Sequence, residues 1–138
     1  DFAKFHPGGS LGKNLISKVD QFLSPQKPQV SEDSTIRDVI ISISASSHGI
    51  TVVTNGDSIV GVITDGDLRR MLMKGEDVSQ VLAKDIMSSH PKTIERDALA
   101  KDAMKILKEN NIGQLIVTEK GRYYGIIDLH TLLDEGIN

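Results

Sequence analysis

The chain contains no cysteine and no tryptophan among its 138 residues. Without cysteine it forms no disulfide and carries no thiolate chemistry, which agrees with a cytoplasmic location. No apolar run approaches the ~18 residues that a membrane-spanning helix needs. The stretch from Asp1 to Lys13 also lacks the apolar core of a secretory signal peptide. We therefore expect a cytoplasmic protein with no membrane partner.

Charge of one sign is scarce as well. Sixteen Lys and Arg stand against nineteen Asp and Glu, a net charge of -3, and neither sign forms a long run. A nucleic-acid surface usually combines a basic stripe with aromatic side chains, and this chain has only three Phe and two Tyr. The composition excludes nucleic acid as a partner. The length predicts one domain, or two very small ones that share a core.

Two stretches of the chain follow the same order of predicted elements. The first repeat runs from Pro28 to Leu72, and the second runs from Pro91 to Gly136. Pairing Pro28 with Pro91 and Val53 with Val117 shifts the offset from 63 to 64, which we assign to one insertion across the first helix. Two further pairs are Gly61 with Gly125 and Ile63 with Ile127. A repeat of about sixty residues buries too little apolar surface alone, so two repeats are expected to pack together.

Each repeat reads as β-α-β-β-α. The first helix of each has apolar residues at i, i+3, i+4 and i+7: Ile36, Val39, Ile40 and Ile43, then Ala100, Ala103, Met104 and Leu107. Ser34 and Asp97 are the predicted N-caps, and Gly49 and Asn110–Asn111 the predicted helix ends. The expected strands are 29–30, 50–54, 59–64, 92–94, 114–118 and 123–128, with hairpin turns at "NGD" and "EKGR". The expected second helices are 67–74 and 129–135.

The segments outside the repeats have simpler predictions. Residues 75–89 are expected to form a linker with one or two short helical turns. Before the first repeat, "SLGKNLISKVDQFL" predicts a helix with Ser10 as its N-cap. The resulting organisation is a linker over 1–18, a first domain over 19–77 and a second domain over 78–138. The fold class is α/β of the α+β kind.

The tandem β-α-β-β-α pattern, with "GVITDGDLRR" after the last strand of the first repeat, resembles the cystathionine β-synthase (CBS) domain pair. The resemblance covers Val19 to Ile137. It implies two units packed as a pseudo-two-fold pair. It also implies regulatory ligands, commonly adenosyl nucleotides, bound between the units, and an attached enzyme or transporter that they control.

The opening string "FHPGGSLGKNL" resembles the junction at which bacterial arabinose-5-phosphate isomerases pass from a sugar isomerase (SIS) domain into a CBS pair. The resemblance implies that the chain is a piece of such an isomerase, whose catalytic domain would precede Asp1. That enzyme interconverts ribulose 5-phosphate and arabinose 5-phosphate for the synthesis of Kdo, a sugar of lipopolysaccharide and capsule. It implies a catalytic role for His6 in the whole enzyme, and we expect residues 1–138 alone to be inactive.

The predicted ligand site lies where the last strand of the first repeat meets its second helix. Unpaired amides at a helix N-terminus favour phosphate. The Thr64 hydroxyl can donate to a phosphate oxygen, the Asp67 carboxylate can accept from a ribose diol, and Arg69 can neutralise charge. Asp65 stands between them. Ordinary N-capping by Thr64 explains the same residues without any ligand.

Backbone around four further positions is expected to meet the base or ring of that ligand. These positions are Val30, Gly49, Ile50 and Thr51. The second repeat predicts a weaker site at Asp128, Thr131, Gly113 and Gln114. Asp128 replaces Thr64 there, and a carboxylate at that position repels phosphate.

Other chemistries fit the residues less well. Gly8, Ser10 and Gly12 satisfy the G-x-S-x-G pattern of hydrolases, but Pro7 breaks the strand that such an elbow requires. His6, His48, His90 and His130 lack metal-ligand spacing, and Asp65 with Asp67 lack further oxygen ligands. His130 is expected to be a surface or partly packed residue, and we predict no metal.

Two functions remain. The first is a regulatory pair that needs no cofactor and senses a nucleotide or nucleotide-sugar, with AMP, ATP or CMP-Kdo as its ligand. The second is a ligand-free structural module that joins enzyme subunits. In either case we expect a homo-oligomer through the CBS pairs, a dimer or, in the whole enzyme, a tetramer.

Overall fold

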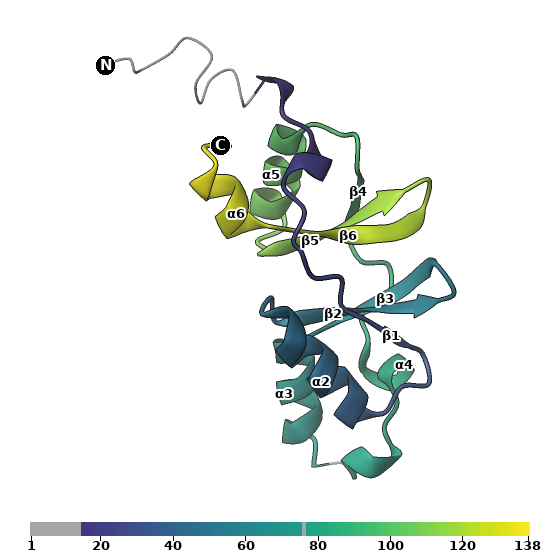
Figure 1. Cartoon of the computed structure of the whole chain (residues 1–138). Coiled ribbons are helices and arrows are strands. Elements are labelled where there is room, and N and C mark those ends of the chain that lie inside the picture. The colour runs from purple at the N-terminus through teal and green to yellow at the C-terminus, as the bar shows by residue number, and fades with distance from the viewer. Residues whose placement is uncertain (1–14, 76) are drawn as a thin grey trace. The chain divides into compact units, whose positions relative to one another are not determined.

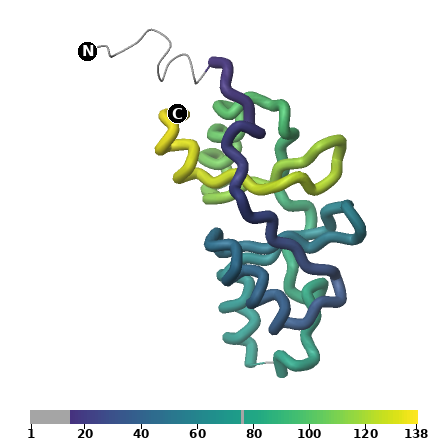
Figure 2. Tube along the Cα trace, in the orientation of Figure 1, coloured from purple at the N-terminus to yellow at the C-terminus, as the bar shows by residue number. Residues whose placement is uncertain are grey.

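The computed structural model describes residues 15–75 and 77–138 (Figures 1 and 2). By contacts these residues form two compact units. We call them the repeat-one unit, which comprises Gln26–Lys92 and Gly121–Tyr123, and the repeat-two unit, which comprises the segment up to Pro25, Thr93–Lys120 and Tyr124–Asn138. Among the described residues, no helix has the length and apolar character to cross a membrane.

The repeat-one unit has the predicted β-α-β-β-α order. Strand β1 (Gln29–Ser31) precedes helix α2 (Ile36–Ser46), strands β2 (Ile50–Asn55) and β3 (Ser58–Thr64), and helix α3 (Asp65–Met73). β1 pairs in parallel with β2, with Val30 opposite Val53, and β2 pairs antiparallel with β3. The linker then forms the short 3-10 helix η2 (Val78–Gln80) and helix α4 (Ala83–Ile86), which confirms the predicted helical turns.

The repeat-two unit repeats this order. Strand β4 (Thr93–Glu95) precedes helix α5 (Ala100–Glu109), strands β5 (Gln114–Glu119) and β6 (Arg122–Asp128), and helix α6 (Leu129–Asp134). The strand order is β6-β5-β4, and Ile94 lies opposite Val117 in β4 and β5. Mixed α+β architecture and both repeats are therefore confirmed.

The register corrects the predicted insertion. Val30 opposite Val53 corresponds to Ile94 opposite Val117, so the offset is already 64 before the first helix. The shift therefore lies near Pro28, whose counterpart is Lys92 rather than Pro91. Two identical prolines suggested the wrong pairing, whereas backbone pairing fixes the equivalence.

The helix caps differ from the predicted ones. Thr35, not Ser34, caps α2 by accepting a hydrogen bond from the Asp38 amide, and Leu99 rather than Asp97 precedes α5. Ser34 instead accepts the Ser31 amide in the turn before the helix. A short polar residue one position nearer the helix takes the capping role because its backbone is already extended there.

The observed ends and buried faces of α2 and α5 match the sequence prediction only in part. Asn111 adopts a positive φ, as expected beyond α5, but Ser47 takes the left-handed C-cap of α2 ahead of Gly49. The face of α5 is buried as predicted. In α2, Ile40 is 46% exposed although the pattern predicts it in the core.

Two short segments precede the repeats, and we call them the leading segments. Val19–Ser24 precedes the first repeat but packs on the repeat-two unit. Ala83–Ser88 precedes the second repeat but packs on the repeat-one unit. The Val19 amide donates to Ala98 O (2.8 Å), as the Ala83 amide donates to Ser34 O (2.8 Å). Each segment then reaches the last strand of its unit. The Ser24 amide donates to Ile126 O, and Ser88 exchanges two hydrogen bonds with Val62. The leading segments thus complete the sheet edges and cores of their units.

The predicted continuous helix up to Leu23 is wrong for the described part. Leu15 and Ile16 are helical, but α-helical geometry stops before Ser17, and only the 3-10 helix η1 (Val19–Gln21) follows. The amides of Val19 and Asp20 bind carbonyls at Ala98 and Arg96 instead of carbonyls four residues back. Ser10, the predicted cap, lies outside the described residues.

Each unit has its own apolar core. The repeat-two core includes the buried α5 face and also takes in the leading segment: Val19, Ala100, Ala103, Met104, Leu107, Leu115, Ile127 and Leu132. The repeat-one core gathers Val39, Ile43, Val53, Ile63 and Ala83, with a neighbouring cluster of Ile36, Met71 and Val81. Both cores hold the strand ends on which the predicted sites depend.

Arg96 ties the first leading segment to the repeat-two unit. Its guanidinium donates to Asp20 (3.1 Å) and to Glu119 (2.9 Å) and stacks over the Tyr124 ring at 4.6 Å. The hydrogen bond to Asp20 raises the pKa of Arg96. We expect Arg96→Ala to speed hydrogen exchange at the Val19 and Asp20 amides several-fold, because their partner loop loses its anchor.

The matched control is Lys84→Ala. Lys84 forms the corresponding but more exposed ion pair with Asp33 (3.2 Å) on the repeat-one unit. Its loss should leave the Val19 and Asp20 amides unchanged. Equal exchange in Arg96→Ala and the unmodified chain would show that Arg96 does not hold the segment.

Candidate functional site

The predicted ligand residues meet, in part, at a corner of the repeat-one unit. Ile50 begins β2 directly opposite Thr64 at the end of β3, and the Asp65 amide donates to Gly49 O (3.0 Å). The Asp65 carboxylate leans over Gly49, because a methyl group there would lie 2.9 Å from Asp65 Oδ2. We call these residues, together with Asp67, the strand-end corner.

Thr64 and Asp67 face each other across the first turn of α3. The Asp67 amide donates to Thr64 Oγ1 (3.2 Å), while the Thr64 amide (2.9 Å) and hydroxyl (3.2 Å) donate to Asp67 Oδ2. Arg70 donates to Asp67 Oδ1 at 2.6 Å. Asp67 is 9% exposed. The two groups expected to bind a ligand therefore cap α3, and a ligand must compete with those hydrogen bonds.

The other predicted residues are dispersed. Arg69 is exposed on α3, and Arg70, which the sequence reasoning omitted, is the arginine that pairs with Asp67. Thr51 is fully buried, and its hydroxyl bonds to Ser42 (2.7 Å). Val30 lies on β1, opposite Val53 and three residues along β2 from Ile50. The structure thus joins Gly49, Ile50, Thr64, Asp65 and Asp67, but not Arg69 or Val30.

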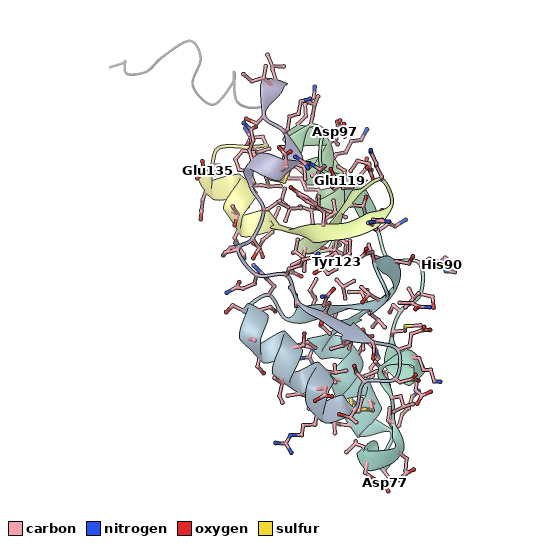
Figure 3. All side chains as sticks on the ribbon, turned by 45° about the vertical axis from the view of Figure 1, so that its right-hand side comes forward. Asp77, His90, Asp97, Glu119, Tyr123 and Glu135 are labelled. Carbon is pink, nitrogen blue, oxygen red and sulfur yellow. The ribbon has the colours of Figure 1, made fainter. Side chains whose placement is uncertain are left out.

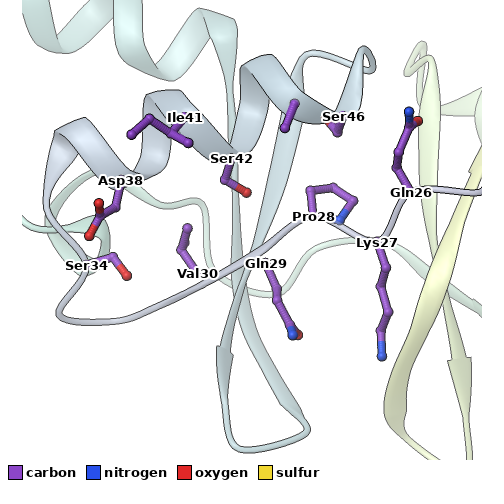
Figure 4. A pocket seen from close by; sticks show the side chains of 11 residues that line it. Gln26, Lys27, Pro28, Gln29, Val30, Ser34, Asp38, Ile41, Ser42 and Ser46 are labelled. Carbon is purple, nitrogen blue, oxygen red and sulfur yellow. The ribbon is translucent and has the colours of Figure 1, made fainter.

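Val30 instead lines a cavity between β1 and α2, about 580 Å³ in volume (Figure 4). Its walls come from β1 with the segment leading into it, and from one stripe of α2 with the turn before it: Gln26, Lys27, Pro28, Gln29, Val30, Ser34, Asp38, Ile41, Ser42, Ala45 and Ser46. We call it the β1–α2 cavity. Ser46 connects its wall to the corner, because the Ser46 hydroxyl donates to Ile50 O (3.3 Å).

The sequence reasoning missed the α2 residues of this cavity. A signal was present in the comparison of the repeats, because Ser42 and Ala45 correspond to the larger Ile106 and Glu109 at the offset of 64. Small residues on a helix that faces a sheet leave space. That comparison required the correct offset, which the paired prolines obscured.

A second cavity, of about 700 Å³, borders Asp67. It is lined by Asp67, Arg70, Met71, Lys74, Asp77, Gln80, Val81, Asp85 and Ile86. Asp77, labelled in Figure 3, accepts hydrogen bonds from the Ser79 hydroxyl and amide, which lower its pKa. Three carboxylates and two cations share this lining, so it offers no excess of positive charge for a phosphate.

The second repeat forms a corresponding corner with different chemistry. The Leu129 amide donates to Gly113 O (2.8 Å), as Asp65 does to Gly49. Asp128 caps α6 by accepting the His130 amide (2.8 Å), and Gln114 Nε2 donates to its other oxygen at 3.5 Å. Thr131 is exposed. A buried carboxylate thus occupies the position of the Thr64 hydroxyl, as the sequence indicated.

Among residues 15–75 and 77–138, no three His, Asp or Glu side chains gather as potential metal ligands. His130 is exposed on α6. His6, to which the resemblance assigns a catalytic role, lies outside the described residues, as does the Gly8–Gly12 pattern.

The chain matches known families along most of its length. The CBS domain family matches residues 19–74 and 83–138. The chain belongs to the CBS domain family. It therefore carries two CBS domains in tandem, and each domain contains one of the two repeats. The domain boundaries proposed at residues 18, 77 and 78 remain a prediction.

Curated relatives of this CBS pair are arabinose 5-phosphate isomerases. The CBS pair is 38% identical to KdsD of Pseudomonas aeruginosa and 30% identical to KdsD of Escherichia coli K12, each over 99% of this chain and 43% of the relative. It is 33% identical to KpsF of Escherichia coli over 87% of this chain and 37% of that protein. The chain thus spans less than half the length of these relatives.

Solved structures share the fold of the CBS pair. A CBS domain protein from Pyrobaculum aerophilum, complexed with AMP, has a TM-score of 0.76 at 23% identity and covers 83% of this chain and 89% of its own. CBSX2 in complex with AMP has a TM-score of 0.69 at 19% identity, over 85% and 93% of the two chains. At these identities the likeness establishes the fold.

Tyr123 (Figure 3) offers a test of how the β1 entry is held. Its hydroxyl donates to Pro28 O (2.7 Å), its ring carries the Lys27 ammonium at 5.0 Å, and burial raises the pKa of Tyr123. The folded state thus keeps the phenol protonated above its usual pKa of about 10. The stability that the buried, protonated phenol contributes is complete below pH 10 and is lost as the pH rises above 10.

We expect Tyr123→Phe to lose about 1 kcal/mol at pH 7.5, the typical worth of one hydrogen bond. The unmodified chain should lose more stability than the variant between pH 9 and pH 11, so that the difference narrows. Urea unfolding at both ends of that range measures this, with Tyr124→Phe as the control. A constant difference across the range would show that the phenol does not titrate with unfolding.

Proposed function

We propose that this CBS pair is the regulatory part of an arabinose-5-phosphate isomerase and senses a nucleotide or nucleotide-sugar. Its resemblance to KdsD over 99% of the chain supports the isomerase context. The strand-end corner of the repeat-one unit is the binding site in this proposal. AMP, ATP and CMP-Kdo are the ligands to test, and the AMP complexes of two structural relatives support the first.

The observation that carries the proposal is the difference between the two corners. In each corner, the first amide of the second helix donates a hydrogen bond to the carbonyl just before the middle strand. Asp65 donates to Gly49 O in the first corner, and Leu129 donates to Gly113 O in the second. Only the first presents a hydroxyl, Thr64, at the helix N-terminus, whereas Asp128 places a negative charge there. A hydroxyl at a helix N-terminus can donate a hydrogen bond to a phosphate, which a carboxylate in the same place repels.

Binding requires the corner to exchange partners. A ligand phosphate takes the place of Asp67 at the Thr64 hydroxyl, and a ribose diol takes one of the Asp67 oxygens now bound to Thr64. The exposed Arg69 neutralises charge at the rim. A ligand regulates the attached enzyme only if it binds one arrangement of the pair better than another.

The test is a thermal-shift and calorimetric titration with AMP, ATP and CMP-Kdo. At a ligand concentration one hundred times its dissociation constant, we expect a stabilisation of about 2.7 kcal/mol. The double variant Thr64→Asp/Asp67→Thr imports the second repeat's cap; it should remain folded, with a lower stability because the amide at position 64 loses the Asp67 carboxylate, and it should not respond. A response that the double variant retains would place the ligand elsewhere.

Residues 1–138 alone should not interconvert ribulose 5-phosphate and arabinose 5-phosphate in this proposal. The chain spans 43% of the length of KdsD of Pseudomonas aeruginosa, and aldose–ketose isomerisation through an enediol needs several positioned proton donors and acceptors. Turnover by the purified chain in a coupled assay would overturn this part of the proposal.

A structural, ligand-free role is the second proposal. The hydrogen bonds between Thr64 and Asp67 favour it, because they satisfy the corner without a ligand. Four exposed apolar side chains of α2 and α3 also need a cover: Ile40, Ile41, Leu72 and Met73. Light scattering with and without the three nucleotides separates the roles. A ligand-independent dimer with no binding supports the structural one.

A further inference from the structure

The chain has four methionines, and their exposure to solvent differs widely. Met71 and Met104 are 3% and 1% exposed and belong to the apolar clusters of their units. Met73 is 85% exposed on α3. Met87 is the intermediate case, because its side chain is only partly buried where it packs against the repeat-one core. A dissolved oxidant can therefore reach Met87 in the folded chain, although less readily than Met73.

The Met87 side chain lies directly against Gly61 of β3. A methyl group built on Gly61 would lie 2.6 Å from Met87 Sδ and 2.9 Å from Met87 Cγ, so the thioether fills the space beside the glycine backbone. At the next residue, the Ser88 amide donates to Val62 O (2.9 Å) and the Val62 amide donates to Ser88 O (3.0 Å). These neighbouring contacts hold the end of the second leading segment, Ala83–Ser88, on β3.

The corresponding contact in the repeat-two unit contains no sulfur. At the offset of 64, Leu23 takes the place of Met87, and Leu23 Cδ2 would lie 3.2 Å from a methyl group on Gly125. The amide of the next residue, Ser24, donates to Ile126 O (2.8 Å), so the backbone arrangement is similar too. A leucine side chain is a hydrocarbon, which peroxides leave unchanged when they oxidise a thioether. The chain thus carries an oxidisable and an inert version of one contact.

We propose that Met87 is a reversible oxidation site, through which a hydroperoxide loosens the second leading segment from β3. The peroxide transfers one oxygen atom to Met87 Sδ. A sulfur–oxygen bond forms as the O–O bond breaks, the sulfur loses two electrons to the peroxide, and the other peroxide oxygen leaves as water or an alcohol. A methionine sulfoxide reductase reverses the step with two electrons from a dithiol, and the sulfoxide oxygen leaves as water.

Oxidation changes the contact on β3 in two ways. The sulfoxide oxygen needs hydrogen-bond donors, which water supplies and the apolar core beside Met87 does not. The added oxygen also enlarges a side chain that already fills the space beside Gly61. We therefore expect the oxidised side chain to turn into solvent, and the hydrogen bonds between Ser88 and Val62 to open more often.

Peptide mass spectrometry of the whole chain after treatment with hydrogen peroxide tests whether the sulfur can be reached. Met73 should gain an oxygen first and Met87 second, whereas Met71 and Met104 should stay unmodified until the chain unfolds. If Met87 is oxidised no faster than Met71 and Met104, its sulfur is shielded in the folded chain and the proposal is wrong.

The effect on the fold is measured in Met73→Leu, which removes the most exposed sulfur and leaves Met87 as the accessible one. After oxidation this variant should melt about 5 °C lower, and its Val62 and Ser88 amides should exchange hydrogen on the order of tenfold faster. The Ser24 amide of the first leading segment should exchange as before. Methionine sulfoxide reductases should restore the original melting temperature, and a failure to restore it would overturn the reversibility.

The matched control is Met73→Leu/Met87→Leu, which places the side chain of Leu23 at the corresponding position. Peroxide should change neither its melting temperature nor the exchange at Val62 and Ser88. An equal loss in this double variant would assign the effect to another residue, and unchanged exchange in the chain with oxidised Met87 would show that the sulfoxide does not release the segment. Either result overturns the proposal. The experiment contains no nucleotide, so its failure leaves the proposed function standing.

Discussion

Gly61→Ala is expected to destabilise the CBS pair by about 2 to 3 kcal/mol, a fall in Tm on the order of 10 °C. A methyl group on Gly61 would lie 2.6 Å from Met87 Sδ and 3.0 Å from Met87 Cβ. The sulfur can rotate away, but the Cβ is fixed by the backbone of the second leading segment. That segment must therefore shift from β3, where Ser88 pairs with Val62.

The second repeat supplies the matched control for this substitution. A methyl group on Gly125 would lie 3.2 Å from Leu23 Cδ2, the far end of a flexible side chain. Gly125→Ala should therefore cost less than about 1 kcal/mol. Urea unfolding of both variants measures the difference. Equal effects at Gly61 and Gly125 would show that the leading segments do not pack on these strands as described.

Asp67→Ala is expected to cost about 2 kcal/mol in the absence of any ligand. The Thr64 amide loses its acceptor at 2.9 Å, the Thr64 hydroxyl loses its acceptor, and Arg70 loses its ion pair. A buried amide left without a partner costs about 1 to 3 kcal/mol. Chemical unfolding without nucleotide measures this loss.

Arg70→Ala is the control, because it removes the ion pair and leaves the capping hydrogen bonds intact. Arg70 is 67% exposed, so its loss should cost no more than about 1 kcal/mol. If Asp67→Ala and Arg70→Ala unfold alike, the carboxylate does not stabilise the α3 cap. Asp67→Ala is expected to lower both the stability and the ligand affinity. A loss of binding in this variant therefore does not by itself show that Asp67 contacts the ligand.

The repeats, the strands and their turns could be predicted because local chemistry determines them. Gly56 and Gly121 take the positive φ that the two hairpin turns require, and the apolar spacing of α5 matches its buried face. The path of the leading segments could not be predicted. The amides of Val19 and Ala83 bind carbonyls far away in sequence, and a helical pattern of side chains carries no signal of such partners.

The strand-end corner was predicted in composition but not in its internal bonding. Thr64 and Asp67 have side chains suited to binding a nucleotide and also to capping a helix, and the structure shows them in the capping arrangement. The sequence analysis assigned the charge-neutralising role to Arg69, although the i, i+3 spacing from Asp67 favours its neighbour Arg70 as the partner of that carboxylate. The β1–α2 cavity depends on the small side chains at positions 42 and 45. That these side chains are smaller than their counterparts becomes clear only when the two repeats are aligned through their strands.

The most direct test of the central claim is a calorimetric titration of AMP and CMP-Kdo into the unmodified CBS pair and into Thr64→Asp/Asp67→Thr. We expect saturable binding of at least one of them to the unmodified chain, and none to the folded double variant. Equal binding to both proteins, or no binding to either, would contradict the claim that the corner of the first repeat is the sensor.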